Sequence, residues 1–311
     1  MLKFRVKSVS MPPPLPKPTS RKHQPLTSDV VDPVWLMKAL AATLLAALVC
    51  GYLTVCFLFY QGQWQLTLHP VRTASSPSSI GGAPYQLVHF GPDESAVPQL
   101  TGWWIPASSG GRYTNKTVLF LSGSEGSLSD ATPTLVTLHN LGINIFAFDY
   151  RGYGQSAAIH PSQINMLRDT ESAWTYLTVS RAIPAQQIIP YGSDIGASLA
   201  VSLASTHHQV PAVILDSPRG DLLDVAAKDP RSRLIPVRLL FLEDFPLAKP
   251  LRTLKIPKLL LSRTPSAHQA FQTAADPKLI VELASPSDAA YSQTVTRFLD
   301  KISVPPPTIP D

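Results

Sequence analysis

The chain carries one long apolar run near its N-terminus. Residues 39–60 read ALAATLLAALVCGYLTVCFLFY, 22 positions without a charged side chain. As a helix this run would be about 33 Å long, enough to cross a hydrocarbon core of roughly 30 Å. A cleaved signal peptide is the alternative, but its apolar part is usually shorter. The pattern predicts a transmembrane anchor over residues 35–60, with the lipid bilayer as the partner of residues 39–60.

After this run, short apolar stretches alternate with segments of helical periodicity. The stretches 117–121 and 143–148 are continuously apolar, as expected of strands buried on both faces of a sheet. Alternating strands and helices favour a mostly parallel sheet with helices on both faces, an α/β fold. The expected strands are 85–90, 100–106, 117–121, 143–148, 187–191, 212–215, 258–261 and 279–283, and the expected helices include 161–180 and 291–302.

Composition divides the rest of the chain. Residues 1–33 contain seven prolines and several basic side chains, which is typical of a disordered, polyproline-like tail. Residues 61–84 are rich in small and polar residues and are expected to link the anchor to the domain. The α/β domain itself is expected to span residues 85–303. A second Pro-rich tail follows at 304–311.

The positive charge is confined to the segment before the anchor. Residues 1–38 hold seven Lys or Arg and two acidic residues, whereas the whole chain has a net charge of +5. The remainder is therefore neutral, which argues against a nucleic-acid partner, because such proteins present a basic face. Basic residues before an apolar helix and few after it predict a cytoplasmic N-terminus and an extracytoplasmic domain.

Both cysteines of the chain, Cys50 and Cys56, lie inside the apolar run. The domain consequently has no cysteine from which to build a disulfide framework or a cysteine metal site. The sequence indicates neither a metal nor a cofactor.

Residues 188–200, IIPYGSDIGASLA, carry the main candidate for chemistry. A strand, a glycine-flanked turn and a helix in this order are the layout of the nucleophile elbow, G-x-S-x-G. Between Gly192 and Gly196, however, the central residue is Asp194 rather than serine. Ser193 is one position too early, which would direct its side chain away from a site.

Several motifs resemble one family. FDYRGYGQSA at 148–157, PYGSDIGASLA at 190–200 and VILDSPRGDLLDVA at 213–226 follow an anchor and GWWIP at 102–106. In this order they resemble the membrane-anchored branch of the α/β-hydrolase fold superfamily, with serine aminopeptidase-like, monoacylglycerol-lipase-like and depalmitoylase-like members. The resemblance covers roughly residues 55–303. It implies an α/β-hydrolase fold and, in active relatives, a Ser-His-acid triad.

The family's functional positions transfer only in part. The resemblance implies oxyanion-binding backbone N–H groups at Ser124, in the SGSEG loop, and at Ile195, after the elbow centre. It places the triad acid within 262–271, where no Asp or Glu occurs. It places the triad histidine within 284–291, and no histidine follows His268. Three side-chain positions of the triad are thus unmatched.

Two hypotheses follow for Asp194. The first is a scaffold or binding protein without hydrolysis, with a small-molecule or lipid-like ligand as the candidate partner, in which Asp194 stabilises the first turn of a helix by about 0.3–1 kcal/mol. The second is an active hydrolase, acting on esters or peptides as the family does, or using Asp194 as the nucleophile. A carboxylate can attack an alkyl halide or epoxide carbon, as in haloalkane dehalogenases and epoxide hydrolases. That route needs a histidine to activate water, for which His268 and then His160 are the candidates.

Overall fold

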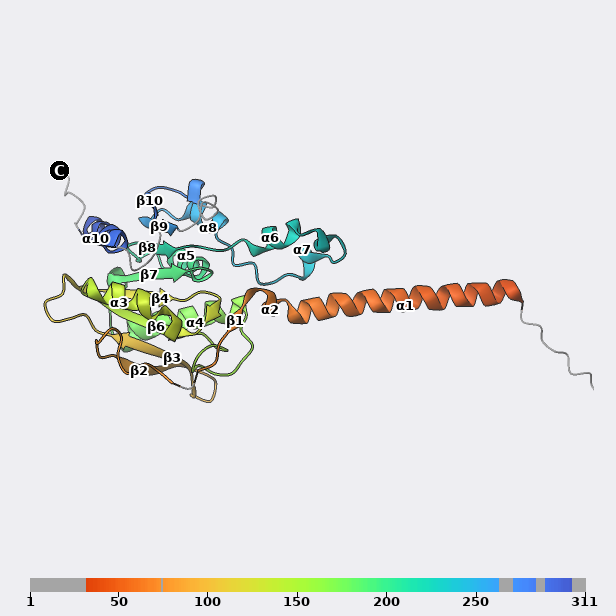
Figure 1. Cartoon of the computed structure of the whole chain (residues 1–311), viewed down its shortest axis with the longest axis horizontal. Coiled ribbons are helices and arrows are strands. Elements are labelled where there is room, and N and C mark those ends of the chain that lie inside the picture. The colour runs from red at the N-terminus through yellow and green to blue at the C-terminus, as the bar shows by residue number, and fades with distance from the viewer. Residues whose placement is uncertain (1–31, 74, 263–270, 284–288, 304–311) are drawn as a thin grey trace, which may run out of the picture. The chain divides into compact units, whose positions relative to one another are not determined.

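The computed structural model describes residues 32–73, 75–262, 271–283 and 289–303 (Figure 1). The chain divides after Tyr52 into two compact units. Helix α1, Pro33–Gly62, crosses that division and contains the whole predicted anchor. Its most apolar 18-residue window has a mean hydropathy of 2.2, so α1 is long and apolar enough to span a membrane.

Within the described residues of the second unit, eight strands form one sheet in the order β10-β9-β8-β7-β4-β6-β3-β2. β2 and β3 pair antiparallel, β3 joins β6 antiparallel, and the remaining neighbours are parallel. All eight predicted strands are present, so the predicted mostly parallel sheet is confirmed. The strands are β2 Gln86–Pro92, β3 Pro98–Ile105, β4 Tyr113–Leu121, β6 Ile143–Asp149, β7 Ile188–Ser193, β8 Val213–Asp216, β9 Lys258–Ser262 and β10 Lys278–Glu282.

Helices cover both faces of this sheet. Along β4, Leu119 and Leu121 join one buried cluster with helices α4 and α5, whereas Val118 and Phe120 join a second cluster with α3 and α10. Alternate side chains of a strand point to opposite faces, so the two clusters are the two sides of the sheet. The helices are α3 Thr132–Asn140, α4 Gln163–Thr175, α5 Gly196–Thr206 and α10 Ala289–Ser303.

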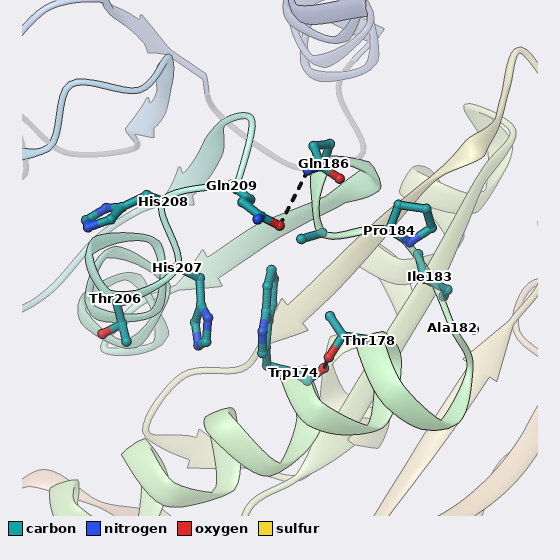
Figure 2. Close-up of a pocket in the computed structure, with 11 residues that line it drawn as sticks. Trp174, Thr178, Ala182, Ile183, Pro184, Gln186, Thr206, His207, His208 and Gln209 are labelled. Carbon is teal, nitrogen blue, oxygen red and sulfur yellow. Dashed lines mark hydrogen bonds between the residues drawn. The ribbon is translucent and has the colours of Figure 1, made fainter.

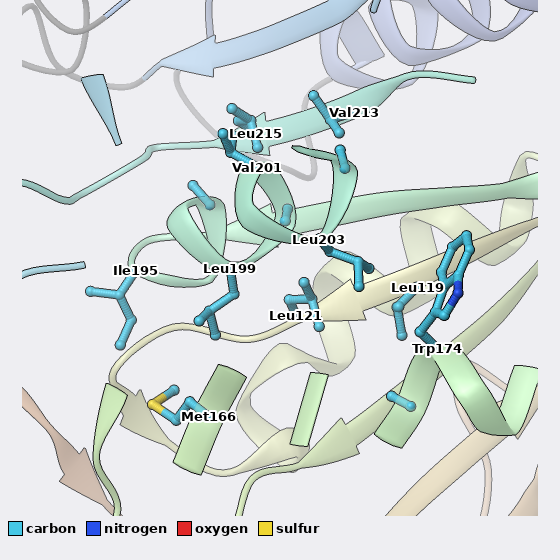
Figure 3. Packing of buried hydrophobic residues seen from close by; sticks show 14 of the residues in the cluster. Leu119, Leu121, Met166, Trp174, Ile195, Leu199, Val201, Leu203, Val213 and Leu215 are labelled. Atoms are coloured by element: carbon cyan, nitrogen blue, oxygen red, sulfur yellow. The ribbon is translucent and has the colours of Figure 1, made fainter. Parts of the chain in front are cut away.

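Helix α5 is buried along most of its length in the first cluster (Figure 3). Leu199, Val201 and Leu203 of α5 lie among side chains of β4, β8 and α4. This packing fixes the helix that follows the glycine-flanked turn. The predicted helix 161–180 is α4 followed by a π-helical turn, Tyr176–Ser180.

Part of the segment predicted as a linker packs against the domain. Residues Trp64–Thr67 form the short helix α2, and β1, His69–Pro70, pairs with β5, Glu125–Gly126. Arg72 donates from Nη1 to the carbonyl oxygens of Tyr153, at 3.0 Å, and Ser156. The chain between the anchor and the first strand of the large sheet is therefore held to the loop that follows β6.

A run of short helices follows β8 and was not predicted from the sequence. We call residues 222–242 of this run the cap segment. Helices of four to seven residues contain too few turns to display a periodic apolar face, which is why the pattern did not reveal them. The run contains α6 Leu222–Lys228, α7 Val237–Leu240, α8 Ala248–Thr253 and the 3₁₀ turn Pro230–Arg233; further 3₁₀ turns are Leu128–Ala131 and Ala185–Gln187.

Candidate functional site

The predicted elbow is present at the end of β7. β7 ends at Ser193, α5 begins at Gly196, and Asp194 sits between them with φ of 52°. This left-handed conformation is uncommon for a residue other than glycine, although aspartate is among those that adopt it most often. Strain of this kind characterises the nucleophile position of the elbow. Asp194 therefore occupies that position in geometry as well as in sequence.

Gly192 and Gly196 are required by close packing at this turn. A Cβ atom on Gly192 would lie 2.4 Å from the carbonyl oxygen of Gly196 and 2.5 Å from the Cα atom of Ala197. A Cβ atom on Gly196 would lie 2.2 Å from the carbonyl oxygen of Leu121. Any side chain here would push strand and helix apart. The two glycines explain the shape of the elbow whether or not it is catalytic.

The Asp194 carboxylate is fully engaged by its neighbours. Its Oδ2 accepts the backbone N–H of Ser124 at 3.0 Å and the Ser124 hydroxyl at 2.7 Å. Arg219 donates from Nε to Oδ1 at 2.6 Å and from Nη2 to Oδ2 at 3.0 Å, and Nη2 also donates to Ser124 Oγ. Among the residues that the structure describes, Ser124 and Arg219 are the side-chain partners of Asp194. The three residues form a closed, charge-balanced cluster.

The Ser124 loop is positioned by two tyrosines of the FDYRGYGQSA motif. Tyr150 donates its hydroxyl to the carbonyl oxygen of Ser122 at 3.3 Å, and Tyr153 donates to that of Ser124 at 2.9 Å. Burial raises the pKa of Tyr153, and the negative charge of Asp194 raises it further. Tyr153 therefore stays protonated and remains a donor. The motif serves to aim the Ser124 N–H at the elbow.

Arg219 was not identified from the sequence. It lies three residues after β8, and its backbone N–H donates to the carbonyl oxygen of Asp194 at 3.1 Å. Its position in the loop after β8 could have indicated that it lies near the elbow after β7, because the carboxyl ends of parallel strands share one edge of the sheet. That edge carries many polar residues, so the motif VILDSPRGDLLDVA alone did not single out the arginine.

The Asp194–Arg219 pair forms part of the wall of an open hollow of about 530 Å³. The side chains of Asp194 and Arg219 are 29% and 43% exposed, so both can be reached from solvent. Ile195 lies between Asp194 and the start of α5 and is fully buried; its role as a second N–H donor stays a prediction. Other residues of the hollow include Ser122, Gly123, Ser124, Ser193 and Thr134.

The two histidines proposed as bases are not seen to contact Asp194. His268 lies in 263–270, outside the described residues. The resemblance assigns the triad acid to that loop and the triad histidine to the loop that contains 284–288, which also lies outside the described residues. His160 is exposed, and its ring lies against Trp64 with a centroid separation of 5.1 Å. The structure thus directs His160 toward α2, and it leaves the role of His268 a prediction.

His207 belongs to a different hollow, at the far end of α5 (Figure 2). Its Nε2 is 2.8 Å from Glu171 Oε2, and its ring stacks on Trp174 at 4.5 Å. Helix α5 separates it from the elbow by about 16 Å, the length of 11 helical residues. His207 is therefore excluded as a base for Asp194.

Asp216, at the end of β8, has structural partners. It accepts the Tyr191 hydroxyl at 2.8 Å and the Ser217 hydroxyl at 2.9 Å.

In the described part of the chain, no cluster of three or more His, Cys, Asp or Glu residues could hold a metal ion.

Solved structures share this architecture. The esterase Pf2001 of Pyrococcus furiosus superposes with a TM-score of 0.57 at 20% identity, covering 75% of this chain and 99% of that one. An α/β-hydrolase of Vibrio vulnificus gives 0.55 at 20% identity, covering 76% and 96%. The chain has the α/β-hydrolase fold. The predicted fold class is therefore confirmed.

Sequence comparison agrees with this fold. No family model matches the chain. An uncharacterized protein of Mycobacterium tuberculosis is 31% identical over 164 residues, covering 53% of this chain and 56% of that protein. Alpha/beta hydrolase domain-containing protein 17C of Xenopus tropicalis is 38% identical over 129 residues, covering 41% and 40%. The chain spans about half the length of the curated relatives it matches. These matches support the α/β-hydrolase superfamily and the branch indicated by the motifs.

Proposed function

We propose that this chain is a membrane-anchored α/β-hydrolase-fold protein that does not hydrolyse substrates through a Ser-His-acid triad and acts by binding. The observation that carries the proposal is the engagement of the Asp194 carboxylate by the Ser124 N–H and by Arg219. The chain itself thus fills the place where an active relative would bind its substrate.

An occupied oxyanion donor argues against acyl transfer. Such a donor acts when it lies about 2.7–3.1 Å from the oxygen that becomes negative during the reaction. Here the Ser124 N–H is already 3.0 Å from Asp194 Oδ2, so a carboxylate of the protein sits where that oxygen belongs. Attack by Asp194 on a carbonyl would moreover form an anhydride, from which the carboxylate leaves more readily than an alkoxide or amine.

The Arg219 contacts also argue against an aspartate nucleophile. Both carboxylate oxygens accept hydrogen bonds from the guanidinium, a bidentate arrangement that is stronger than neutral hydrogen bonds. These hydrogen bonds stabilise the negative charge of the Asp194 carboxylate, which makes it a weaker nucleophile toward an alkyl carbon. Arg219 would have to move before Asp194 could attack, and a base would still be needed to hydrolyse the alkyl ester.

The membrane part of the proposal rests on helix α1. Its uncharged core of 22 residues is sufficient to cross a bilayer, and basic residues precede it. By the positive-inside rule, the N-terminus would be cytoplasmic and the α/β domain extracytoplasmic.

A lipid-like molecule is the ligand class that the surroundings of Arg219 favour. A hollow of about 450 Å³ adjoins Arg219 and is lined mainly by apolar residues of the cap segment and of residues 59–67. Most ligand pockets combine an apolar lining with a few polar groups that fix orientation. Arg219 bonds to Asp194 and Ser124 through Nε and Nη2, so among the described residues its Nη1 remains to orient a polar head.

Ligand retention can be tested with the detergent-solubilised chain. Native mass spectrometry should find a co-purified single-chain lipid on the wild type and on Val179→Arg, an exposed substitution outside this hollow. Val225→Arg places a charge in the hollow at a residue that is itself exposed, so it should lose the lipid without unfolding. Equal retention by all three proteins would contradict a ligand site here.

The absence of hydrolysis can be tested on the full chain in lipid nanodiscs. The assay measures multiple turnovers on a panel of ester, thioester, peptide, epoxide and haloalkane substrates. We expect no rate above that of Asp194→Asn, and no labelling by a fluorophosphonate. Ser193→Ala controls for the neighbouring hydroxyl. Turnover that disappears in Asp194→Asn would overturn the proposal and restore the aspartate-nucleophile hypothesis.

A further inference from the structure

Gln63 joins the end of helix α1 to the cap segment. It is the first residue after α1 and is only 3% exposed. Its Nε2 donates to the carbonyl oxygens of Tyr60 and Leu240, each at 2.9 Å, and its Oε1 accepts the N–H of Leu242 at 2.5 Å. One amide side chain thus ties the last turns of α1 to α7. If α1 spans a bilayer, the part of the cap segment bonded to Gln63 therefore lies at nearly the same membrane depth as the end of α1.

The cap segment exposes large apolar side chains. Leu239 is 78% exposed, Leu234 76% and Val225 64%. Single exposed leucines are ordinary, whereas several large apolar side chains exposed within one short segment make it a candidate interaction surface. Leu66 in α2, which lines the same hollow as Val225, is also 67% exposed. Residues 59–67 and the cap segment therefore share the apolar lining of one hollow.

Basic side chains accompany these apolar ones. Residues 228–242 contain Lys228, Arg231, Arg233 and Arg238 but a single acidic residue, Asp229. Arg233 and Arg238 are exposed, beside Leu234 and Leu239 in the sequence. Arginine and lysine next to apolar side chains are typical of segments that lie in a membrane interface, where the charged ends reach the phosphates.

We propose that the cap segment is a second membrane contact, which inserts Leu234 and Leu239 into the interface of the leaflet from which α1 emerges. The occupant of this surface is a phospholipid bilayer. The inference rests on the proposed membrane anchor, and it holds whether or not the elbow is catalytic. In consequence, the hollow of about 450 Å³ beside Arg219 opens close to lipid, since the cap segment forms part of its wall.

The depth of the anchor's end agrees with this placement. Tyr60 ends the uncharged run, and Gln63 follows three positions later, about 4.5 Å along a helix axis. The polar interface of a bilayer is about 5–8 Å deep on each side of the hydrocarbon core. Gln63 therefore lies within the interface when the run 39–60 fills the core. The α7 backbone bonded to Gln63 then lies at nearly the same depth.

Site-specific fluorescence on the full chain tests the contact. The native cysteines are replaced by serine, and an environment-sensitive dye is attached at Leu234→Cys or Leu239→Cys in phosphatidylcholine nanodiscs. Some discs contain lipids with a nitroxide quencher at the top of the acyl chain. We expect at least threefold stronger quenching at both positions than at Val179→Cys, a matched site that is 72% exposed on the π-helical turn.

A dye on Cys56, with Cys50→Ser, separates this inference from the anchor itself. If Cys56 is quenched while positions 234 and 239 behave like 179, the second contact is wrong and the anchor stands. If Cys56 is not quenched, the membrane anchor fails and the inference fails with it. Quenching at Cys56, 234 and 239 but not at 179 supports both.

Discussion

Asp194 and Arg219 meet where a hydrolase of this fold would hold its nucleophile. Aspartate tolerates the left-handed turn, and its carboxylate spans the gap to the Ser124 N–H. A charged side chain in such a place needs a counter-charge, which Arg219 supplies from the loop after β8. Under the proposed function, aspartate at the serine position does more than remove a nucleophile, because its carboxylate bonds to Ser124 and Arg219 where an active relative would receive a substrate.

The strength of this pair can be measured by a double-mutant cycle. We expect a coupling free energy of about 1 kcal/mol between Arg219→Ala and Asp194→Asn, because the pair is bidentate but partly exposed and thus screened by solvent. The measurement is the free energy of unfolding from denaturant titration in detergent. Arg233→Ala, at an exposed position of the cap segment, serves as the control and should change it by less than about 0.5 kcal/mol. A coupling near zero would show that the cluster is not formed.

Gly192 should tolerate no side chain. Gly192→Ala places a Cβ atom within 2.5 Å of the backbone of Gly196 and Ala197, which can relax only by displacing α5 from the sheet. We expect a loss of 3 kcal/mol or more, on the order of severe overpacking, or failure to fold. Gly62→Ala is the matched control, because nothing lies within 4 Å of its added Cβ. Similar thermal midpoints for both variants would contradict the elbow geometry.

At the scale of elements, the loops at the carboxyl edge of the sheet are held by buried polar contacts. Asp169 of α4 accepts the N–H of Arg151 at 2.9 Å and its Nε at 2.6 Å, which fixes the loop after β6. That loop presents Tyr153 to the carbonyl of Ser124. Helix α4 thus contributes indirectly to the position of the Ser124 loop.

Asp169 predicts a pH dependence of stability. Burial raises its pKa from 3.8 to about 6, against the opposing effect of Arg151. Because the folded pKa exceeds the unfolded one, its contribution to stability is complete below about pH 4 and is lost as the pH rises through 6. The stability of the wild type relative to Asp169→Asn should therefore fall by about 2 kcal/mol between pH 4 and 6.5. Parallel unfolding free energies for the two proteins across this range would contradict it.

Gln63 is expected to control the mobility of α7. Gln63→Ala removes the acceptor of the Leu242 N–H and the donor to the Leu240 carbonyl. Loss of these bonds should cost about 1–3 kcal/mol locally, since buried polar groups are left unpaired. Hydrogen exchange should become faster in residues 237–242 and stay unchanged in the peptide that covers α5. Unchanged exchange in α7 would show that Gln63 does not hold the cap segment.

Which elements the sequence predicts depends on their length and periodicity. The strands of the sheet were predicted because buried parallel strands are continuous apolar runs, and the elbow because Gly192 and Gly196 have a diagnostic spacing. Arg219 could not be assigned, because its contact with Asp194 depends on how two loops far apart in sequence converge. The cap helices were missed because α7 has only four residues. The packing of residues 63–72 against the domain also depends on tertiary contacts rather than on local pattern.

For the whole molecule, the distribution of charged and apolar residues predicts the orientation of the chain across a membrane. With basic residues before α1 and Arg72 as the only Lys or Arg between Gly62 and Arg112, the N-terminal tail should lie in the cytoplasm. Protease added to intact cells should digest the α/β domain and leave a tag at residue 1 protected. Replacing Arg21, Lys22 and Lys38 by serine should lower the fraction in this orientation. Removal of the N-terminal tag with the domain intact would reverse the proposed topology.

We propose that the carboxylate of Asp194 closes the elbow and that no histidine base reaches it. An experimental structure of the full chain in lipid nanodiscs that includes residues 263–270 would test this proposal. We expect Asp194 Oδ2 at about 3 Å from the Ser124 nitrogen, as here, with Arg219 paired to both oxygens and the nearest imidazole nitrogen beyond about 10 Å. A His268 nitrogen within about 3–5 Å of the carboxylate, with Arg219 turned away, would contradict the account.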